Sequence, residues 1–194
     1  MDWQAQYEAG EIPWDEGGPH PALLDFIAES GPFQGLILVP GCGRGHEVRA
    51  LSTTGNQVLG LDIAPGAIEA ARAFPKAGRE EYIPGDLFDL DSARRGSFDW
   101  VVEHTCFCAI EPAMRPRYAE AVAGALKPGG NLFAIFHLDP QLDRKPPHGV
   151  SVEELDELFS SSFSLLKQWV PARTFAGRET RELIRVLRRN RQSL

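Results

Sequence analysis

Short apolar runs alternate along this chain with stretches of helical pattern, and this alternation restricts the fold more than any other feature of the sequence. The first run, residues 35–40 (GLILVP), leads directly into a glycine-rich turn at 41–45 (GCGRG), and a helical pattern follows. Strands that alternate with helices form right-handed βαβ units in which the strands are parallel. We therefore predict an α/β protein with a largely parallel, Rossmann-like sheet.

The other predicted elements continue this order to the end of the chain. We expect helices at 46–54, 67–74, 116–130 and 151–159, and strands at 57–62, 81–86, 97–104 and 131–139. Two further strands, 163–170 and 181–189, follow each other without a helix between them. The pattern predicts a sheet of seven mostly parallel strands that ends in an antiparallel hairpin.

Composition and charge narrow the classes of partner. The chain has 194 residues, a length that suits a single domain over residues 1–194. No apolar run approaches the ~20 residues that a membrane-spanning helix needs. The acidic N-terminus shows no secretory signal, so we expect a cytoplasmic protein. The low number of cysteines and the lack of a long apolar face favour a monomer. A net charge of −7 disfavours nucleic acid as a partner.

The end of the chain has the opposite charge. From Lys167 onward, eight Lys and Arg residues face two Glu residues. A basic tail of this kind can bind nucleic acid. Apolar residues are interleaved with Arg185 and Arg188, however, and this favours a terminal strand with solvated edges.

Glycines and acids stand at the ends of the first three predicted strands, where ligands bind in open α/β sheets. Asp62 follows Gly41 by 21 residues, close to the ~20 at which an acid meets ribose hydroxyls in nucleotide sites. Asp86 follows the third strand, and His46 stands where the dinucleotide fingerprint has a glycine. Each feature alone also fits a tight turn or a helix cap. Together they resemble the S-adenosylmethionine pattern of class I methyltransferases.

More specific motifs extend this resemblance to one family. They are an aromatic N-terminus (Trp3-x3-Tyr7-x6-Trp14), VPGCGRGHE at 39–47, CFCAIEPAMRPRYAE at 106–120 and a Pro146-Pro147 pair. With these motifs the chain resembles the thiopurine S-methyltransferase superfamily, and most closely the halide/thiol (thiocyanate) methyltransferases. Tyr7 departs from the plant pattern, which has tryptophan there, and His104 stands in place of a tyrosine.

The resemblance implies an enzyme that transfers the methyl group of S-adenosylmethionine, leaving S-adenosylhomocysteine. The acceptor would be a small soft nucleophile: a thiol, thiocyanate, a halide or a thiopurine. The alternatives are an O- or N-methyltransferase of the same fold and a non-catalytic nucleotide-binding module. The cofactor-binding residues that we predict are Trp3, Tyr7, Trp14, Gly41, Gly43, Asp62, Ile63, Asp86, Leu87 and His104.

The aromatic residues at 1–20 are predicted to form a cap that excludes water from the cofactor, although they would also serve to attach the N-terminus. The predicted catalytic residues are His104 and Arg115. Imidazole exchanges protons near neutral pH, so His104 suits a base for thiols, or it packs against adenosine. Arg115 suits an anion site at a helix start, or a surface ion pair with Glu111 or Glu120.

We predict no metal site. Cys106 and Cys108 form a CxC pattern without a second pair of cysteines, which does not match zinc-ligand spacing. Cys42 is interpreted as a small packing residue in the glycine turn.

Overall fold

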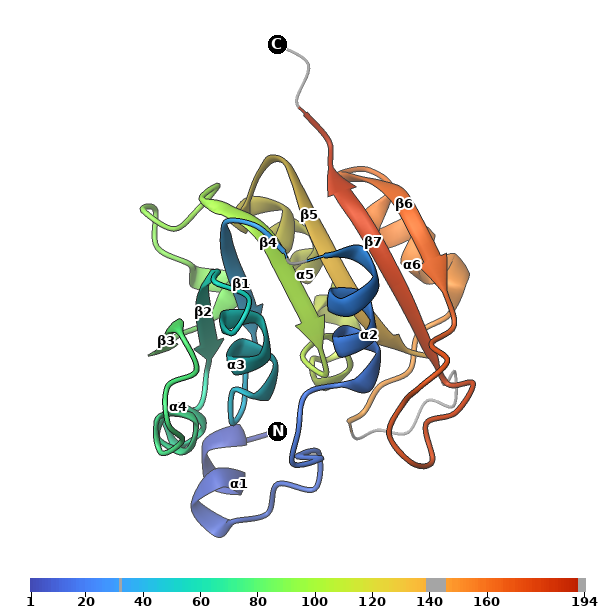
Figure 1. The fold of residues 1–194 in the computed structure, drawn as a ribbon. Helices are drawn as coiled ribbons and strands as arrows, with labels where there is room; N and C mark the ends of the chain where they lie inside the picture. Colours follow the sequence, from blue (N-terminus) through green and yellow to red (C-terminus); the bar gives the residue numbers. More distant parts are fainter. Residues whose placement is uncertain (32, 139–145, 192–194) are drawn as a thin grey trace.

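The structure is a computed structural model that describes residues 1–31, 33–138 and 146–191. It contains a seven-stranded sheet in the order β3-β2-β1-β4-β5-β7-β6 (Figure 1). The strands are β1 Leu36–Pro40, β2 Gln57–Asp62, β3 Arg79–Pro84, β4 Phe98–His104, β5 Leu126–His137, β6 Phe163–Trp169 and β7 Glu182–Arg189. The helices are α1 Trp3–Ala9, α2 Pro21–Ser30, α3 His46–Ser52, α4 Pro65–Arg72, α5 Arg115–Ala125 and α6 Val152–Phe159, with short 3₁₀ turns η1 Leu87–Asp89, η2 Phe107–Ala109 and η3 Pro112–Met114.

The strand directions confirm the predicted fold class. Strands β3, β2, β1, β4 and β5 pair in parallel, whereas β7 is antiparallel to both β5 and β6. The C-terminal hairpin is therefore present, with its second strand inserted between β5 and β6.

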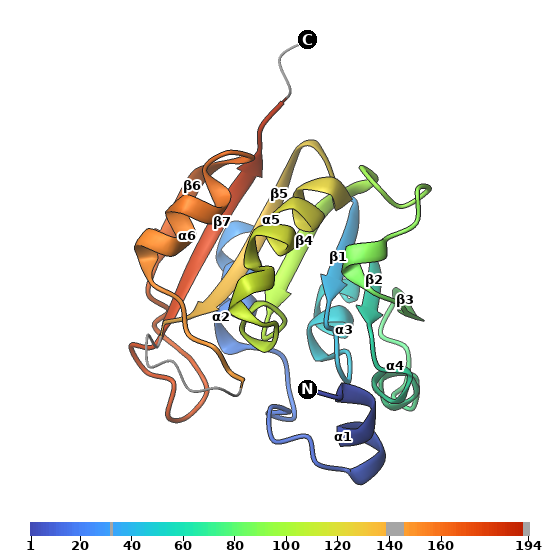
Figure 2. The ribbon, with the colours of Figure 1, turned by 180° about the vertical axis from the view of Figure 1, so that it is seen from behind.

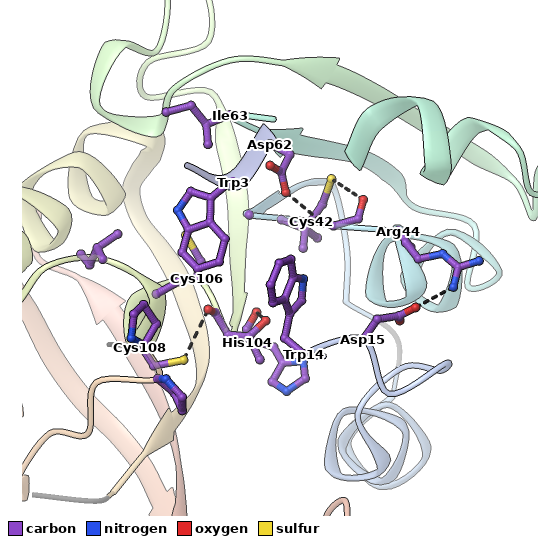
Figure 3. Close-up of a pocket in the computed structure, with 18 of the residues that line it drawn as sticks. Trp3, Trp14, Asp15, Cys42, Arg44, Asp62, Ile63, His104, Cys106 and Cys108 are labelled. Atoms are coloured by element: carbon purple, nitrogen blue, oxygen red, sulfur yellow. Dashed lines mark hydrogen bonds and ion pairs between the residues drawn. The ribbon is translucent and has the colours of Figure 1, made fainter. Parts of the chain in front are cut away.

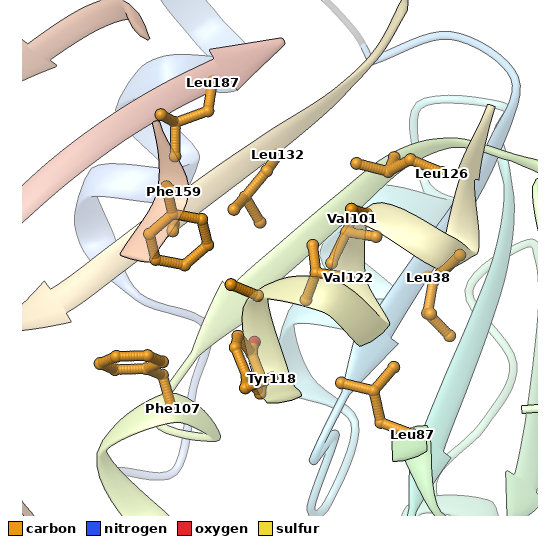
Figure 4. Packing of buried hydrophobic residues seen from close by; sticks show 14 of the residues in the cluster. Leu38, Leu87, Val101, Phe107, Tyr118, Val122, Leu126, Leu132, Phe159 and Leu187 are labelled. Atoms are coloured by element: carbon orange, nitrogen blue, oxygen red, sulfur yellow. The ribbon is translucent and has the colours of Figure 1, made fainter. Parts of the chain in front are cut away.

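Helices cover both faces of this sheet. Helices α2 and α3 lie on one face (Figure 1), and α5 and α6 lie on the other (Figure 2). Neighbouring strand residues divide between the two sides: Phe133 packs in the cluster with α2 and α3, and Phe136 packs in the cluster with α5 and α6. In the second cluster, Tyr118 and Val122 of α5 lie beside Val101 of β4 (Figure 4). Burial on both faces explains why the central strands are apolar throughout rather than alternating.

Several local predictions were wrong. The predicted helix at 116–130 ends at Ala125, and β5 begins at Leu126, which is extended and pairs with Phe98. Pro128 cannot supply the N–H that a helix would need there. The strand predicted at 131–139 ends at His137, and position 139 lies outside the described residues.

The C-terminal strand was also misjudged, because β7 does not have solvated edges. It lies inside the sheet, and Arg185 within it is only 1% exposed. Its guanidinium group bonds to Gln168 and forms an ion pair with Asp156 at 2.8 Å. Helices α1 and α2 were not predicted. In the part of the chain that the structure describes, no helix is long and apolar enough to span a membrane.

The strand order defines where a ligand can enter. The chain runs from β1 outward to β3 and then returns across the sheet to β4, so that β1 and β4 are neighbours from opposite halves. Ligands bind at such a switch point, beyond the carboxyl ends of the strands.

Candidate active site

A cavity of about 570 Å³ opens at the carboxyl ends of β1, β2, β3 and β4, next to the N-terminal segment. Figure 3 shows Trp3, Trp14, Asp62, His104 and Cys106 around it. All ten residues predicted to bind the cofactor line this cavity: Trp3, Tyr7, Trp14, Gly41, Gly43, Asp62, Ile63, Asp86, Leu87 and His104. Of the two predicted catalytic residues, His104 lines the cavity and Arg115 does not. A volume of this size lies within the range of small-molecule and cofactor sites.

The glycine turn brings the backbone close to neighbouring groups. Gly41 has φ +58°, and a Cβ atom there would lie 2.8 Å from the Cβ atom of Cys106. At Gly45, with φ +73°, a Cβ atom would lie 2.5 Å from the ring of Tyr82. Side chains at these two positions would be strained in the backbone and would clash. Gly41 and Gly43 line the cavity, so at these two positions the turn presents backbone without a side chain.

Asp62 is held in place by the backbone. Its Oδ2 accepts the N–H of Gly43 and its Oδ1 accepts the N–H of Ala64, each at 2.9 Å. The side chain is nearly buried, and this burial raises the pKa of the Asp62 carboxyl despite the two hydrogen bonds. Each carboxylate oxygen can accept a further hydrogen bond, so the group retains acceptor sites for the two hydroxyls of a ribose.

The next strand end contributes a second acid. Asp86 accepts the N–H of Phe88 at 2.8 Å and so caps the turn η1, which matches the ordinary interpretation of this residue. It lines the cavity as well, together with buried Leu87 and the exposed side chain of Ile63. A carboxylate beside apolar side chains suits the edge and faces of an adenine ring.

Three aromatic rings from the N-terminal segment stand over this part of the cavity. Trp14 makes edge-to-face contacts with Trp3, at a centroid distance of 5.2 Å, and with Tyr7, at 6.0 Å. Burial raises the pKa of Tyr7 to about 12, so its hydroxyl remains protonated. The rings thus present neutral, apolar faces to the cavity.

Polar contacts attach this segment to the sheet domain. The side chain of Gln4 accepts the N–H of Gly66 at 2.8 Å. Asp15 pairs with Arg44 at 2.6 Å and with His46 at 2.9 Å. Burial opposes ionisation of Asp15, but its hydrogen bonds outweigh that effect and lower its pKa.

His104 has partners that the sequence patterns did not reveal. Its Nδ1 lies 2.9 Å from Oε1 of Glu47, and its ring packs edge-to-face against the ring of His20. His20 in turn contacts Glu182 at 2.8 Å. One ligand-type atom from each of His20, His104 and Glu182 lies within 4.8 Å of the other two, a grouping that we did not anticipate when predicting no metal site.

Arg115 does not line the cavity. It is 1% exposed and pairs with Glu154 at 2.8 Å, while its Nη2 donates to the carbonyl oxygens of His148 and Gly149. The surface ion pair with Glu111 or Glu120 is therefore wrong. A contact between Arg115 and the acceptor stays a prediction, which this placement does not support.

The sheet order and the strand-end residues together define a class I methyltransferase that uses S-adenosylmethionine. The chain belongs to the thiopurine S-methyltransferase family, whose model matches residues 1–170. Both statements confirm what the sequence motifs predicted. The cavity fits this cofactor, because its floor lacks side chains at the glycines and its acids and aromatic rings match a ribose, an adenine and a sulfonium.

Individual relatives agree with this assignment. The chain is 34% identical over 160 residues to a probable thiol methyltransferase 2 of Arabidopsis thaliana, covering 80% of this chain and 70% of the relative. It has the same identity and coverage with thiocyanate methyltransferase 1 of Brassica oleracea. Among solved structures, it is similar to the 1,6-didemethyltoxoflavin-N1-methyltransferase of Burkholderia thailandensis, crystallised with bound 1,6-didemethyltoxoflavin and S-adenosylhomocysteine. That match has a TM-score of 0.74 at 20% identity and covers 96% of this chain and 84% of the other. It shows that the two proteins share a fold.

Proposed function

We propose that this methyltransferase acts on a small soft nucleophile, first of all a thiol, with thiocyanate, halides and thiopurines as the other members of the class. The relatives named as thiol and thiocyanate methyltransferases support this acceptor class. The observation that carries the proposal is the aromatic cover over the cavity, formed by Trp3, Tyr7 and Trp14 beside Asp62. We further propose that the chain works as a monomer and without nucleic acid.

The cofactor supplies an electrophilic methyl group on a sulfonium sulfur. In this proposal Asp62 binds the ribose, Asp86 and Leu87 receive the adenine, and the glycine turn and Ile63 border the nucleoside. The aromatic rings exclude water from the nucleophile and orient the reactants for an in-line displacement. Each ring face near the sulfonium adds a cation–π attraction of ~0.5–2 kcal/mol.

The cysteines of the cavity are compatible with a reactive methyl group close by. Burial raises the pKa of Cys106 and Cys42 well above the ordinary value, and that of Cys108 to about 12. A thiol attacks as the thiolate, so these protonated side chains are poor nucleophiles.

An acceptor panel tests the proposal. The protein is incubated with methyl-labelled S-adenosylmethionine and with propanethiol, thiophenol, 6-mercaptopurine, thiocyanate, iodide, a phenol and an amine. We expect methylated products from the sulfur or halide acceptors. Methylation of the phenol or the amine alone would contradict the proposal, and so would binding of S-adenosylhomocysteine without transfer to any acceptor.

A further inference from the structure

A buried carboxylate fixes the orientation of the His104 ring. Glu47 lies in the first turn of α3, and its Oε1 is 2.9 Å from Nδ1 of His104. The same oxygen accepts the backbone N–H of His20 at 3.1 Å. Burial raises the pKa of Glu47, but the hydrogen bond and charge of His104 outweigh that effect, and the pKa lies below its ordinary value. The ionised carboxylate therefore accepts the Nδ1 proton of His104.

The tautomer of the neighbouring His20 is fixed as well. Its Nδ1 accepts the N–H of Ala22 at 3.1 Å, as the cap of α2, so this nitrogen carries no proton. The proton of the neutral ring is then on Nε2, which donates to Glu182 at 2.8 Å. A metal ion on Nε2 would require a proton on Nδ1, where it would face the N–H of Ala22. Hydrogen bonding therefore explains the grouping of His20, His104 and Glu182 better than a metal ion does.

Nε2 of His104 is left with an unused lone pair. This atom is buried and has no hydrogen-bond partner among the residues that the structure describes. The His104 side chain is 9% exposed, and the residue lines the cavity. A buried nitrogen of this kind needs a proton donor, and the cavity is where such a donor can bind.

We propose that His104 is the general base of this enzyme, that Glu47 is its positioning residue, and that the acceptor binds as a neutral thiol that loses its proton during transfer. This inference rests on the proposed function and selects one part of its acceptor class. It sets protonated thiols apart from thiocyanate and halides, which arrive as anions and have no proton to give.

The charge of the cavity supports a neutral acceptor. Its lining contains two guanidinium groups, those of Arg44 and Arg178, and five carboxylates, those of Asp15, Glu16, Glu47, Asp62 and Asp86. Both guanidinium groups are already paired, Arg44 with Asp15 at 2.6 Å and Arg178 with Glu16 at 3.0 Å. An excess of negative charge attracts a sulfonium and repels a halide.

The proposed step balances in protons and electrons. Nε2 of His104 takes the proton from the S–H group as the acceptor sulfur forms a bond to the methyl carbon. The bond from that carbon to the sulfonium sulfur breaks, and its electron pair stays on the departing sulfur. The products are a methyl thioether, S-adenosylhomocysteine and a protonated His104, whose charge the carboxylate of Glu47 stabilises.

Other charged groups lie around the His104 ring. Glu182 lies behind His20 and pairs with Arg178 at 3.5 Å, and Glu103 precedes His104 in β4. Burial raises the pKa of the Glu103 carboxyl. Because the unprotonated ring is the active form in this proposal, the rate with an alkyl thiol should rise with pH, whereas the rate with thiocyanate should not.

Two acceptors and three variants test the inference. His104→Asn retains an amide donor for Glu47 but provides no base at the Nε2 position. With propanethiol its kcat should fall by about 10²–10⁴, whereas its rate with thiocyanate should change little. Glu47→Gln should lower kcat for propanethiol and alter the pH profile, because an amide also stabilises the opposite tautomer. Glu47→Asp, which restores a carboxylate, should recover part of the rate.

Glu157→Gln is the matched control for loss of one carboxylate, because this exposed side chain of α6 does not line the cavity. Calorimetric binding of S-adenosylhomocysteine by every variant confirms that its cofactor site is folded. An equal loss for both acceptors in His104→Asn would overturn the base role, as would a metal ion that is stoichiometric in the wild type and lost in this variant. A wild type that prefers thiocyanate or iodide would overturn the neutral acceptor but leave the proposed function intact. If the wild type binds S-adenosylhomocysteine and methylates nothing in the panel, the proposed function itself fails.

Discussion

The two oxygens of Asp62 are occupied by backbone N–H groups before any ribose binds, which orients the carboxylate in advance. Asp62→Asn should weaken binding of S-adenosylhomocysteine by ~1.5–3 kcal/mol, the range for a hydrogen bond to a charged group. The asparagine also places an NH₂ group against a backbone donor, so we expect a modest loss of stability. Titration calorimetry measures the affinity, and Asp89→Asn, an exposed acid on η1, serves as the control. Unchanged affinity in the folded variant would remove Asp62 from the cofactor site.

Glu182 gives a prediction about acid stability. Burial raises its pKa, but hydrogen bonds from His20 and Thr174 lower it from 4.5 to about 2. A lowered folded-state pKa stabilises the protein above the unfolded-state value, and the stabilisation is lost as the pH falls through the folded-state value. Glu182→Gln should therefore be less stable than the wild type at pH 7 by about 3 kcal/mol, and this difference should shrink steadily below about pH 4.5.

Urea unfolding between pH 7 and pH 3 measures this difference. Glu157→Gln, which changes an exposed side chain on α6, should show no comparable dependence on pH. A constant difference between the wild type and Glu182→Gln over the whole range would mean that Glu182 does not act through its charge.

At the scale of elements, the N-terminal segment is the part whose role is easiest to separate from folding. Helix α1 has no buried residue, and the segment is attached through Gln4, Asp15 and its aromatic rings. Deletion of residues 1–14 should leave a folded domain, since the first strand starts at Leu36, but turnover should be severely reduced because the cavity loses its aromatic cover.

Circular dichroism and thermal unfolding check the fold of this truncated protein, and labelled methyl transfer measures its turnover. Glu11→Ala, an exposed change just beyond the same helix, should behave like the wild type. Near-normal turnover after the deletion would show that the aromatic residues only attach the N-terminus.

Elements and strand-end residues were predictable where the information is local. The run at 35–40, the glycines after it and the spacing to Asp62 are all contained in one βαβ unit, so the sequence alone placed them correctly. Helix α2 was missed, although Pro21 stands at its start, because its N-cap is the ring of His20 and not one of the Ser, Thr, Asp or Asn side chains that usually mark a helix start.

The histidine cluster shows the limit of such local patterns. His20 and Glu182 are 162 positions apart, and only the packing of α2 against β7 brings them together. The sequence gives no sign that Glu47 has a special role, because acids commonly occur in the first turn of a helix. Arg185 was misjudged for a similar reason, since its partners Gln168 and Asp156 come from β6 and α6. In each case the partner comes from an element far away in the sequence, so only the folded structure shows the contact.

At the scale of the whole molecule, the two layers of helices share one sheet, so damage to either side should unfold both. Phe136 is 1% exposed and touches Phe107 and Phe159, at centroid distances of 5.2 and 5.6 Å. Phe136→Ala should cost ~3–5 kcal/mol and preserve a single cooperative transition. Leu165→Ala, at a side chain that is 49% exposed, should cost less than ~0.5 kcal/mol.

Urea unfolding monitored by fluorescence and by circular dichroism measures both variants. Separate transitions for the two signals in Phe136→Ala would contradict a shared core, and a small loss of stability would show that the site collapses around the missing ring.

The insertion of β7 between β5 and β6 has a consequence for synthesis of the chain. Translation proceeds from the N-terminus, and residues 182–189 are made after every other strand. Until they leave the ribosome, β5 and β6 both present unpaired backbone edges, and unpaired strand edges promote association with other chains. The sheet therefore stays incomplete until β7 has been synthesised. A nascent chain that stalls after β6 is the form of this molecule most in need of a chaperone.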